Sequence, residues 1–255
     1  MPHDQLMVTV LGSATPYATV DNPCSGYLVT HAGARIWVDA GSGTLAELQR
    51  HVRVDELDAI WISHLHADHS ADLLTAYYAL LFADIDVAAP IPLYGPPGTA
   101  DRLAHFLTNG TDRSPVESAF AFHELHDGHR ATIAATTLTS RAVDHGMPAF
   151  AVRIDTAEAS LTYSGDTGPC AALTELAADT DTLLCEAESD EAPAVEPQVH
   201  HTPEDAADTA RSARARRLVV THVGRSMTPA DAAERAADRL GRDVAYAAPR
   251  RAFTV

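Results

Sequence analysis

The stretch Ser63-His64-Leu65-His66-Ala67-Asp68-His69 places three imidazoles and a carboxylate within a few consecutive residues. It follows the apolar run Ala59-Ile60-Trp61-Ile62, which has the composition of a buried strand. Side chains of an extended segment alternate in direction, so His64 and His66 are expected to point the same way and to bind one cation. Asp68 and His69 follow where the strand gives way to a helix, and that turn directs them at a second cation. The stretch therefore predicts the start of two neighbouring metal sites.

A simpler interpretation is a solvated loop of histidines in which Asp68 caps the next helix. One loop also holds too few ligands for two metals, so a metal centre requires further His and Asp residues elsewhere. Three segments supply them, each as an apolar run that ends in a ligand-type residue and then a glycine or a turn: they end at His145, Asp166 and His222. Each is weak alone, because such residues are common in turns. Together with the first stretch they favour a metal centre.

The order of these motifs resembles the metallo-β-lactamase superfamily, and within it the ribonuclease Z-like phosphodiesterase branch. Further matches, such as Val38-Asp39-Ala40-Gly41 and Leu183-Leu184-Cys185-Glu186-Ala187, are spread over nearly the whole chain. The resemblance implies that His64, His66 and His145 hold one metal. It implies that Asp68, His69 and His222 hold the other and that Asp166 bridges the two. Nitrogen and carboxylate ligands without thiolate suit two Zn²⁺ ions, with Mn²⁺ or Fe²⁺ as alternatives.

A second element carries the assignment to that branch. His200-His201-Thr202 resembles the His-x-Thr element of ribonuclease Z-like enzymes, whose histidine pairs with the glutamate that matches Glu186. We assign this role to His200, because Thr202 then falls two residues later, although the sequence leaves the choice between the two histidines open. Thr202 is equally suited to capping a helix that begins at Pro203. Both roles are compatible.

The expected mechanism follows from charge. Two cations about 3.5–4 Å apart hold a bridging hydroxide and bind a phosphoryl oxygen as charge develops on it. Asp68 orients that hydroxide. His200, kept protonated by Glu186, donates to the developing oxyanion or to the departing alkoxide. The chain is thus expected to be a dinuclear metal-dependent hydrolase with Asp68, His200 and Glu186 as its catalytic residues.

Length and charge restrict the partners. A chain of 255 residues that is 46% apolar can bury one sizeable core, so we expect a single domain over residues 1–255. There are 35 acidic residues against 18 basic ones, all of them arginine, for a net charge of −17. Phosphate backbones repel such a protein, which disfavours a large nucleic-acid partner and favours a small-molecule substrate.

Transfer-RNA processing is disfavoured for a second reason. Ribonuclease Z carries a long exosite arm, which grips the transfer RNA, between the positions that match His145 and Asp166. Here that interval has room only for one short hairpin, over residues 150–155 and 160–163. We therefore expect a small phosphodiester substrate such as a cyclic nucleotide. The chain indeed resembles the actinobacterial cyclic-nucleotide phosphodiesterases of this superfamily.

The main alternative is a lactonase, a thioesterase or a biosynthetic metallo-hydrolase that uses the same metals on an acyl carbon. Those branches usually show Gly-His-Thr-x-Gly-His at the third ligand, where this chain has Asp144-His145-Gly146-Met147-Pro148. A non-enzymatic, metal-stabilised binding module is a weaker alternative, because structural zinc sites are usually closed by four protein ligands. The oligomeric state stays open, with a homodimer as one outcome.

No targeting or membrane segment is evident. Residues 1–6 lack a basic region and a long apolar stretch, and the most apolar window, Leu73 to Ala83, is too short to cross a bilayer. We expect a cytoplasmic protein without a membrane partner. Cys24, Cys170 and Cys185 are too widely spaced for a disulfide framework or a CxxC zinc site.

Strands followed by helices occur twice along the chain, which predicts two sheets packed face to face between helical layers. This α+β four-layer αββα sandwich with two strand-rich halves is the metallo-β-lactamase fold that the resemblance implies. The expected strands are residues 7–11, 26–30, 35–39, 59–63, 91–94, 120–124, 132–143, 149–155, 160–163, 182–186, 217–221 and 243–247. The expected helices are residues 44–51, 71–82, 99–106, 169–178, 203–214 and 229–240. Phe82 is expected in the core, and whether Tyr77 or Tyr78 reaches the metals stays open.

Overall fold

The computed structural model describes residues 5–83, 88–108, 111–195 and 197–255. Two mixed sheets of seven strands face one another. The first sheet consists, in spatial order, of β14 (Ala252–Thr254), β1 (Met7–Gly12), β2 (Gly26–His31), β3 (Ala34–Val38), β4 (Ala59–Trp61), β5 (Ile91–Gly95) and β6 (Phe120–Glu124). The second consists of β13 (Ala245–Tyr246), β12 (Arg217–Val223), β11 (Thr182–Ala187), β10 (Ser160–Tyr163), β9 (Pro148–Asp155), β8 (Thr136–Asp144) and β7 (Arg130–Ile133).

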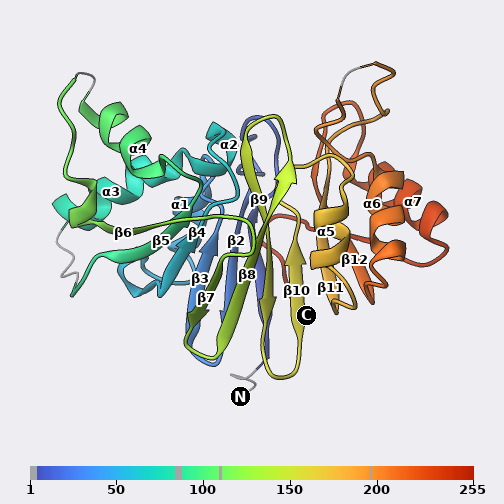
Figure 1. Ribbon diagram of the computed structural model, residues 1–255, viewed down its shortest axis with the longest axis horizontal. Helices are drawn as coiled ribbons and strands as arrows, with labels where there is room; N and C mark the ends of the chain where they lie inside the picture. The colour runs from blue at the N-terminus through green and yellow to red at the C-terminus, as the bar shows by residue number, and fades with distance from the viewer. Residues whose placement is uncertain (1–4, 84–87, 109–110, 196) are drawn as a thin grey trace.

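Helices cover the outer face of each sheet (Figure 1). The first sheet is flanked by α1 (Thr44–Leu48), α3 (Asp72–Phe82) and α4 (Thr99–Thr108), with the short α2 (Ala67–Ser70) and the 3₁₀ turns Val54–Glu56 and Val116–Ser118. The second is flanked by α5 (Ala171–Leu176), α6 (Pro203–Ser212) and α7 (Pro229–Leu240). This order of helix, sheet, sheet and helix confirms the predicted four-layer αββα sandwich.

Three apolar clusters hold the four layers together. The central cluster lies between the sheets and includes Tyr27, Trp61 and Tyr163, whose rings make edge-to-face contacts. The other two fill the space between each sheet and its helices. All six residues of strand β11 are buried, because it has a parallel neighbour on each side and both faces of the sheet are covered. This explains why its sequence is mostly apolar.

Strand direction determines where loops can meet. In the second sheet β10, β11 and β12 are parallel, and β8 runs the same way because β9 is antiparallel to both of its neighbours. The carboxyl ends of these strands therefore lie at one edge of the sheet. The polar side chains described below come from that edge and from the carboxyl end of β4.

The predicted elements differ from the structure in several details, of which two concern the core. Residues 132–143 form a hairpin rather than one strand, because the chain turns at Ala134, which has a left-handed φ of 50°, and separates β7 from β8. Two alanines gave no turn signal. Phe82 is 70% exposed rather than in the core, while Tyr77 is buried and Tyr78 is half exposed.

Among the described residues, no helix has the length and apolar character that crossing a membrane requires.

Candidate metal centre

The loop after β4 is held rigidly by main-chain contacts. His64 lies in the loop, His66 is the N-cap of α2, and Asp68 and His69 lie within α2. The Asp68 carbonyl accepts from the Ser25 amide at 3.1 Å. A Cβ at Gly41 would lie only 2.0 Å from that carbonyl, so glycine is required there. The loop that carries His64 to His69 is therefore packed closely against the segment that follows β3.

The remaining predicted ligands come from the second sheet. His145 follows β8, Asp166 follows β10, and His222 lies near the end of β12. His222 has a left-handed φ of 48°, a conformation that costs a non-glycine residue of order 1–2 kcal/mol and recurs at functional sites. Its Nδ1 lies 2.8 Å from Ser25 Oγ, a contact that fixes the ring direction across the two sheets.

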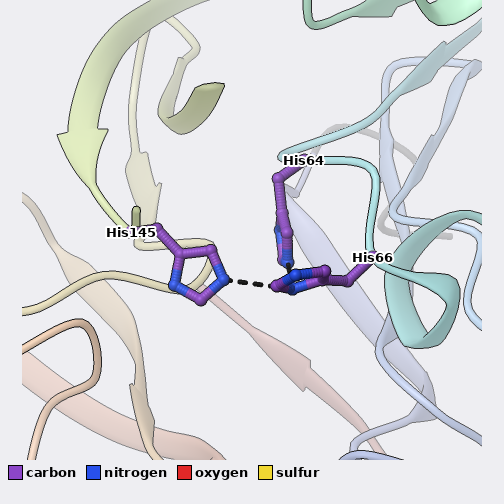
Figure 2. Close-up of side chains that lie close together, drawn as sticks. All are labelled: His64, His66 and His145. Carbon is purple, nitrogen blue, oxygen red and sulfur yellow. Dashed lines mark hydrogen bonds between the residues drawn. The ribbon is translucent and has the colours of Figure 1, made fainter. Parts of the chain in front are cut away.

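Three imidazoles converge on one point (Figure 2). His64 Nε2 lies 3.0 Å from His66 Nδ1, which in turn lies 3.2 Å from His145 Nε2. His64 and His66 come from the loop after β4 and His145 from the opposite sheet. His145 Nδ1 donates to the Val199 carbonyl at 3.0 Å, leaving Nε2 directed at the other two rings. Three ring nitrogens are thus within reach of one cation.

A second group lies beside the first. Asp166 Oδ2 is 3.2 Å from the Nε2 atoms of both His69 and His222, and 3.7 Å from His64 Nε2. Asp68 Oδ2 is 3.8 Å from His69 Nε2 and 3.9 Å from His222 Nε2. The structure therefore brings together all of the sequence-predicted ligands as two adjoining groups, with Asp166 between them.

A second observation, independent of residue type, indicates that these side chains fit a cation. His69 Nε2 and Asp166 Oδ1 are buried polar atoms without a hydrogen-bond partner among the described residues. Buried polar atoms are nearly always paired, so two unpaired atoms at the centre of one cluster fit a bound cation. Divalent cations accept both imidazole nitrogen and carboxylate oxygen.

Charges in the cluster balance against one another. Burial alone would raise the pKa of Asp166, but His222 and His69 outweigh it and hold that pKa well below its usual value. Burial lowers the pKa of His69, but the Asp166 and Asp39 carboxylates outweigh it and raise that pKa well above the usual value. A proton on His69 thus compensates the carboxylates, and a cation that binds there must displace it.

Two histidines of the other group, His64 and His66, have lowered pKa values. Burial, followed by the charge of His69, lowers the pKa of His64 well below its usual value. Burial and the neighbouring His145 also lower the pKa of His66. Both imidazoles are therefore neutral at neutral pH, as ligation requires.

Asp39 is a site residue to which the sequence analysis gave no role. It is fully buried and accepts from His69 Nδ1 at 2.7 Å, from the Ser63 amide at 2.7 Å and from Tyr163 OH at 2.8 Å. A carboxylate of this kind fixes the tautomer and direction of a ligand histidine. A carboxylate directly after the apolar strand 34–38 was the available signal.

His200 and His201 occupy different environments. His200 Nδ1 donates to Glu186 Oε1 at 2.8 Å, and His200 Nε2 donates to Glu188 Oε2 at 2.9 Å. Burial lowers the pKa of His200, but the hydrogen bonds to the two glutamates outweigh it and raise that pKa to about 11. His201 is fully buried, where its Nδ1 donates to the Thr167 carbonyl at 2.6 Å.

A pocket of about 310 Å³ opens beside these groups. It is lined by Thr15, Pro16, His66, Ala67, Asp68, Asp166, Glu188, His200 and His222. Neither Tyr77 nor Tyr78 lines this pocket in the described part of the chain. The Arg225 guanidinium lies 4.3 Å from the centre of the Tyr17 ring. Glu188 and Thr15 had not been singled out from the sequence.

Comparisons with known proteins agree with this geometry. The family model described as "Beta-lactamase superfamily domain" matches residues 34–223, which include the whole cluster. The uncharacterized protein Rv1339 of Mycobacterium tuberculosis H37Rv is 36% identical over 85% of this chain and 80% of that protein. A ribonuclease Z of Mycobacterium sp. strain KMS is 30% identical over 89% of this chain and 87% of that protein. The fold matches the metallo-beta-lactamase fold protein YhfI of Bacillus subtilis with a TM-score of 0.85 at 22% identity, covering 99% of this chain and 100% of that chain.

Proposed function

This chain belongs to the metallo-β-lactamase superfamily, among its ribonuclease Z-like hydrolases, and from that premise we propose that it is a metal-dependent phosphodiesterase for small phosphodiesters. The observation that carries the proposal is that two clusters of imidazole and carboxylate side chains adjoin at Asp166. They lie beside the charged His200 in one pocket. Its 30% identical relative is named as a ribonuclease, an enzyme that cleaves phosphodiesters.

We assign one cation to His64, His66 and His145, and the other to Asp68, His69 and His222. Asp166, which lies between the two groups, is assigned to both cations. All donors are nitrogen or carboxylate oxygen, which favours zinc, with manganese and iron(II) as alternatives. When bound, such a pair of cations supplies an activated water and neutralises charge on a phosphoryl oxygen.

The residues of the chain supply direction and charge. Asp68, which is mostly buried and lines the pocket, orients the attacking water through its carboxylate. His200 is held by Glu186, which itself accepts from the Thr167 amide at 3.0 Å and is fully buried. Against the effect of burial, hydrogen bonds to the two glutamates raise the pKa of His200 to about 11, so its proton can stabilise a phosphoryl oxyanion by hydrogen bonding or pass to a departing alkoxide.

Size and charge favour a small substrate. The hairpin of β9 and β10 fills the interval between His145 and Asp166, so no arm for gripping a folded RNA extends from this position. A net charge of −17 adds repulsion from a long phosphate backbone. A cyclic nucleotide is the substrate that we propose for the first test.

A parallel assay tests the proposal. The zinc-loaded and manganese-loaded proteins are compared on 3′,5′-cyclic AMP, an aryl phosphodiester, a lactone and a thioester. We expect turnover of the phosphodiesters, and we expect His66→Ala and Asp68→Ala to abolish it. Turnover of the lactone or the thioester alone would replace the proposal with acyl hydrolysis at the same metals.

A further inference from the structure

Glu188 is a charged residue of the pocket to which the mechanism above gives no role. Its Oε2 accepts the Nε2–H of His200 at 2.9 Å, so that His200 lies between two carboxylates. Glu186 alone suffices to orient the ring through Nδ1. The second carboxylate therefore occupies the only proton of His200 that is directed at the pocket.

The backbone of Glu188 is fixed, whereas its side chain has access to solvent. The Glu188 amide donates to Glu186 Oε2 at 2.9 Å, and a Cβ at Gly224 would lie 1.9 Å from the Glu188 carbonyl. The side chain is 27% exposed, and within the described ranges its carboxylate makes polar contacts with His200 and, at 3.5 Å, with Thr15 Oγ1. A change of rotamer can thus release His200 without moving the main chain.

Hydrolysis changes the charge of the bound phosphorus group. A phosphodiester is a monoanion; water forms a new P–O bond, the P–O bond to the departing alcohol breaks, that alcohol keeps one proton and the second proton goes to solvent. The product is a phosphomonoester, which carries close to two negative charges near neutral pH. A carboxylate at the pocket wall therefore repels product more strongly than substrate.

We propose that Glu188 is a specificity-determining residue that selects phosphodiester monoanions over phosphomonoester dianions, by competing for His200 Nε2–H and by repelling the second charge. This inference rests on the proposed phosphodiesterase function. In the resting enzyme Glu188 holds His200. It yields to the oxygen of a monoanionic substrate and returns when the dianionic product forms, which favours product release.

The test measures equilibrium binding to the zinc-loaded protein by calorimetry at about pH 8. The probes are phenyl phosphate, a dianion, and benzyl(methyl)phosphinate, a monoanion of similar shape whose P–C bonds are not hydrolysed. Glu188→Gln keeps a hydrogen-bond acceptor for His200 and removes the charge. We expect it to bind phenyl phosphate at least about tenfold more tightly than wild type does, with the affinity for benzyl(methyl)phosphinate changed less than about threefold.

Two further variants make the result decisive. Glu191→Gln removes the same charge from an exposed position of the same loop outside the pocket and should leave both affinities unchanged. Glu188→Asp keeps the charge and should retain the wild-type preference. Equal affinity of wild type and Glu188→Gln for phenyl phosphate would overturn the inference. Because binding is measured without turnover, absence of phosphodiesterase activity would refute the proposed function separately.

Discussion

His200 and His201 are neighbours in the chain, yet their imidazoles have opposite surroundings. His200 lines the pocket between Glu186 and Glu188, whereas His201 is enclosed beneath α6. We predict that His200→Ala lowers kcat on a phosphodiester about 100-fold or more, because a donor to the developing charge is lost. His201→Ala should instead lower the free energy of unfolding by about 1–3 kcal/mol, because the partners Thr167 and Thr209 lose a buried hydrogen bond.

Both variants are measured for steady-state rates and for urea unfolding. A loss of kcat in properly folded His201→Ala, with His200→Ala active, would reverse the assignment of the two histidines.

Asp39 provides a second prediction for a single residue. Its φ of 57° suits Asn as well as Asp, so Asp39→Asn keeps the backbone while removing the charge that fixes His69. We expect zinc affinity to fall about 10–100-fold, as for other carboxylates that orient ligand histidines. Competition with a chromophoric chelator measures this affinity. Asp238→Asn, exposed on α7, is the control, and equal zinc affinity in the two variants would contradict the role of Asp39.

Residues of the site differ in how far the sequence predicts them. His64, His66 and Asp68 are contained in one short motif, so their proximity follows from local geometry alone. Asp39 and Glu188 act through partners 30 and 12 positions away in the chain, His69 and His200. Asp39 leaves one local signal, its place directly after an apolar strand, whereas the local sequence does not distinguish Glu188 from the other acidic residues of this protein. In both cases only the folded arrangement reveals the contact.

Helix α6 links local stability to the site. Thr202 accepts from the Asp205 amide at 3.1 Å and forms a capping box immediately after His200 and His201. We predict that Thr202→Ala lowers the free energy of unfolding by about 1 kcal/mol, because a helix amide loses its cap, and that it also lowers kcat. Thr228→Ala removes the equivalent cap of α7, outside the pocket. That variant should lose similar stability in urea unfolding while keeping wild-type kcat; a matching loss of kcat in both would show that the cap has no specific effect on His200.

Elements with strong end signals were predicted most closely. Helix α7 begins at Pro229 after the cap Thr228 and ends before Gly241, as its sequence indicates. Strand β4 instead ends two residues before the predicted Ser63, because the Ser63 amide donates to the Asp39 carboxylate rather than to a neighbouring strand. Such a distant partner leaves no mark in the local pattern.

At the scale of the whole molecule, the candidate ligands connect the two sheets. His64 and His66 belong to the first half of the chain, and His145, Asp166 and His222 to the second. Metal binding should therefore stabilise the sandwich as a unit. We predict that zinc at about 1,000 times its dissociation constant adds about 4 kcal/mol to the free energy of unfolding. Thermal melting with and without chelator measures the change, and an unaltered melting temperature would mean that no metal joins the halves.

The most direct test of the metal-dependent mechanism is a titration of the chelated protein with zinc while phosphodiester turnover is followed. We predict no turnover without metal and full turnover only when two equivalents are bound per chain, with Asp166→Ala inactive at any zinc concentration. Undiminished turnover in the chelated protein would contradict the account.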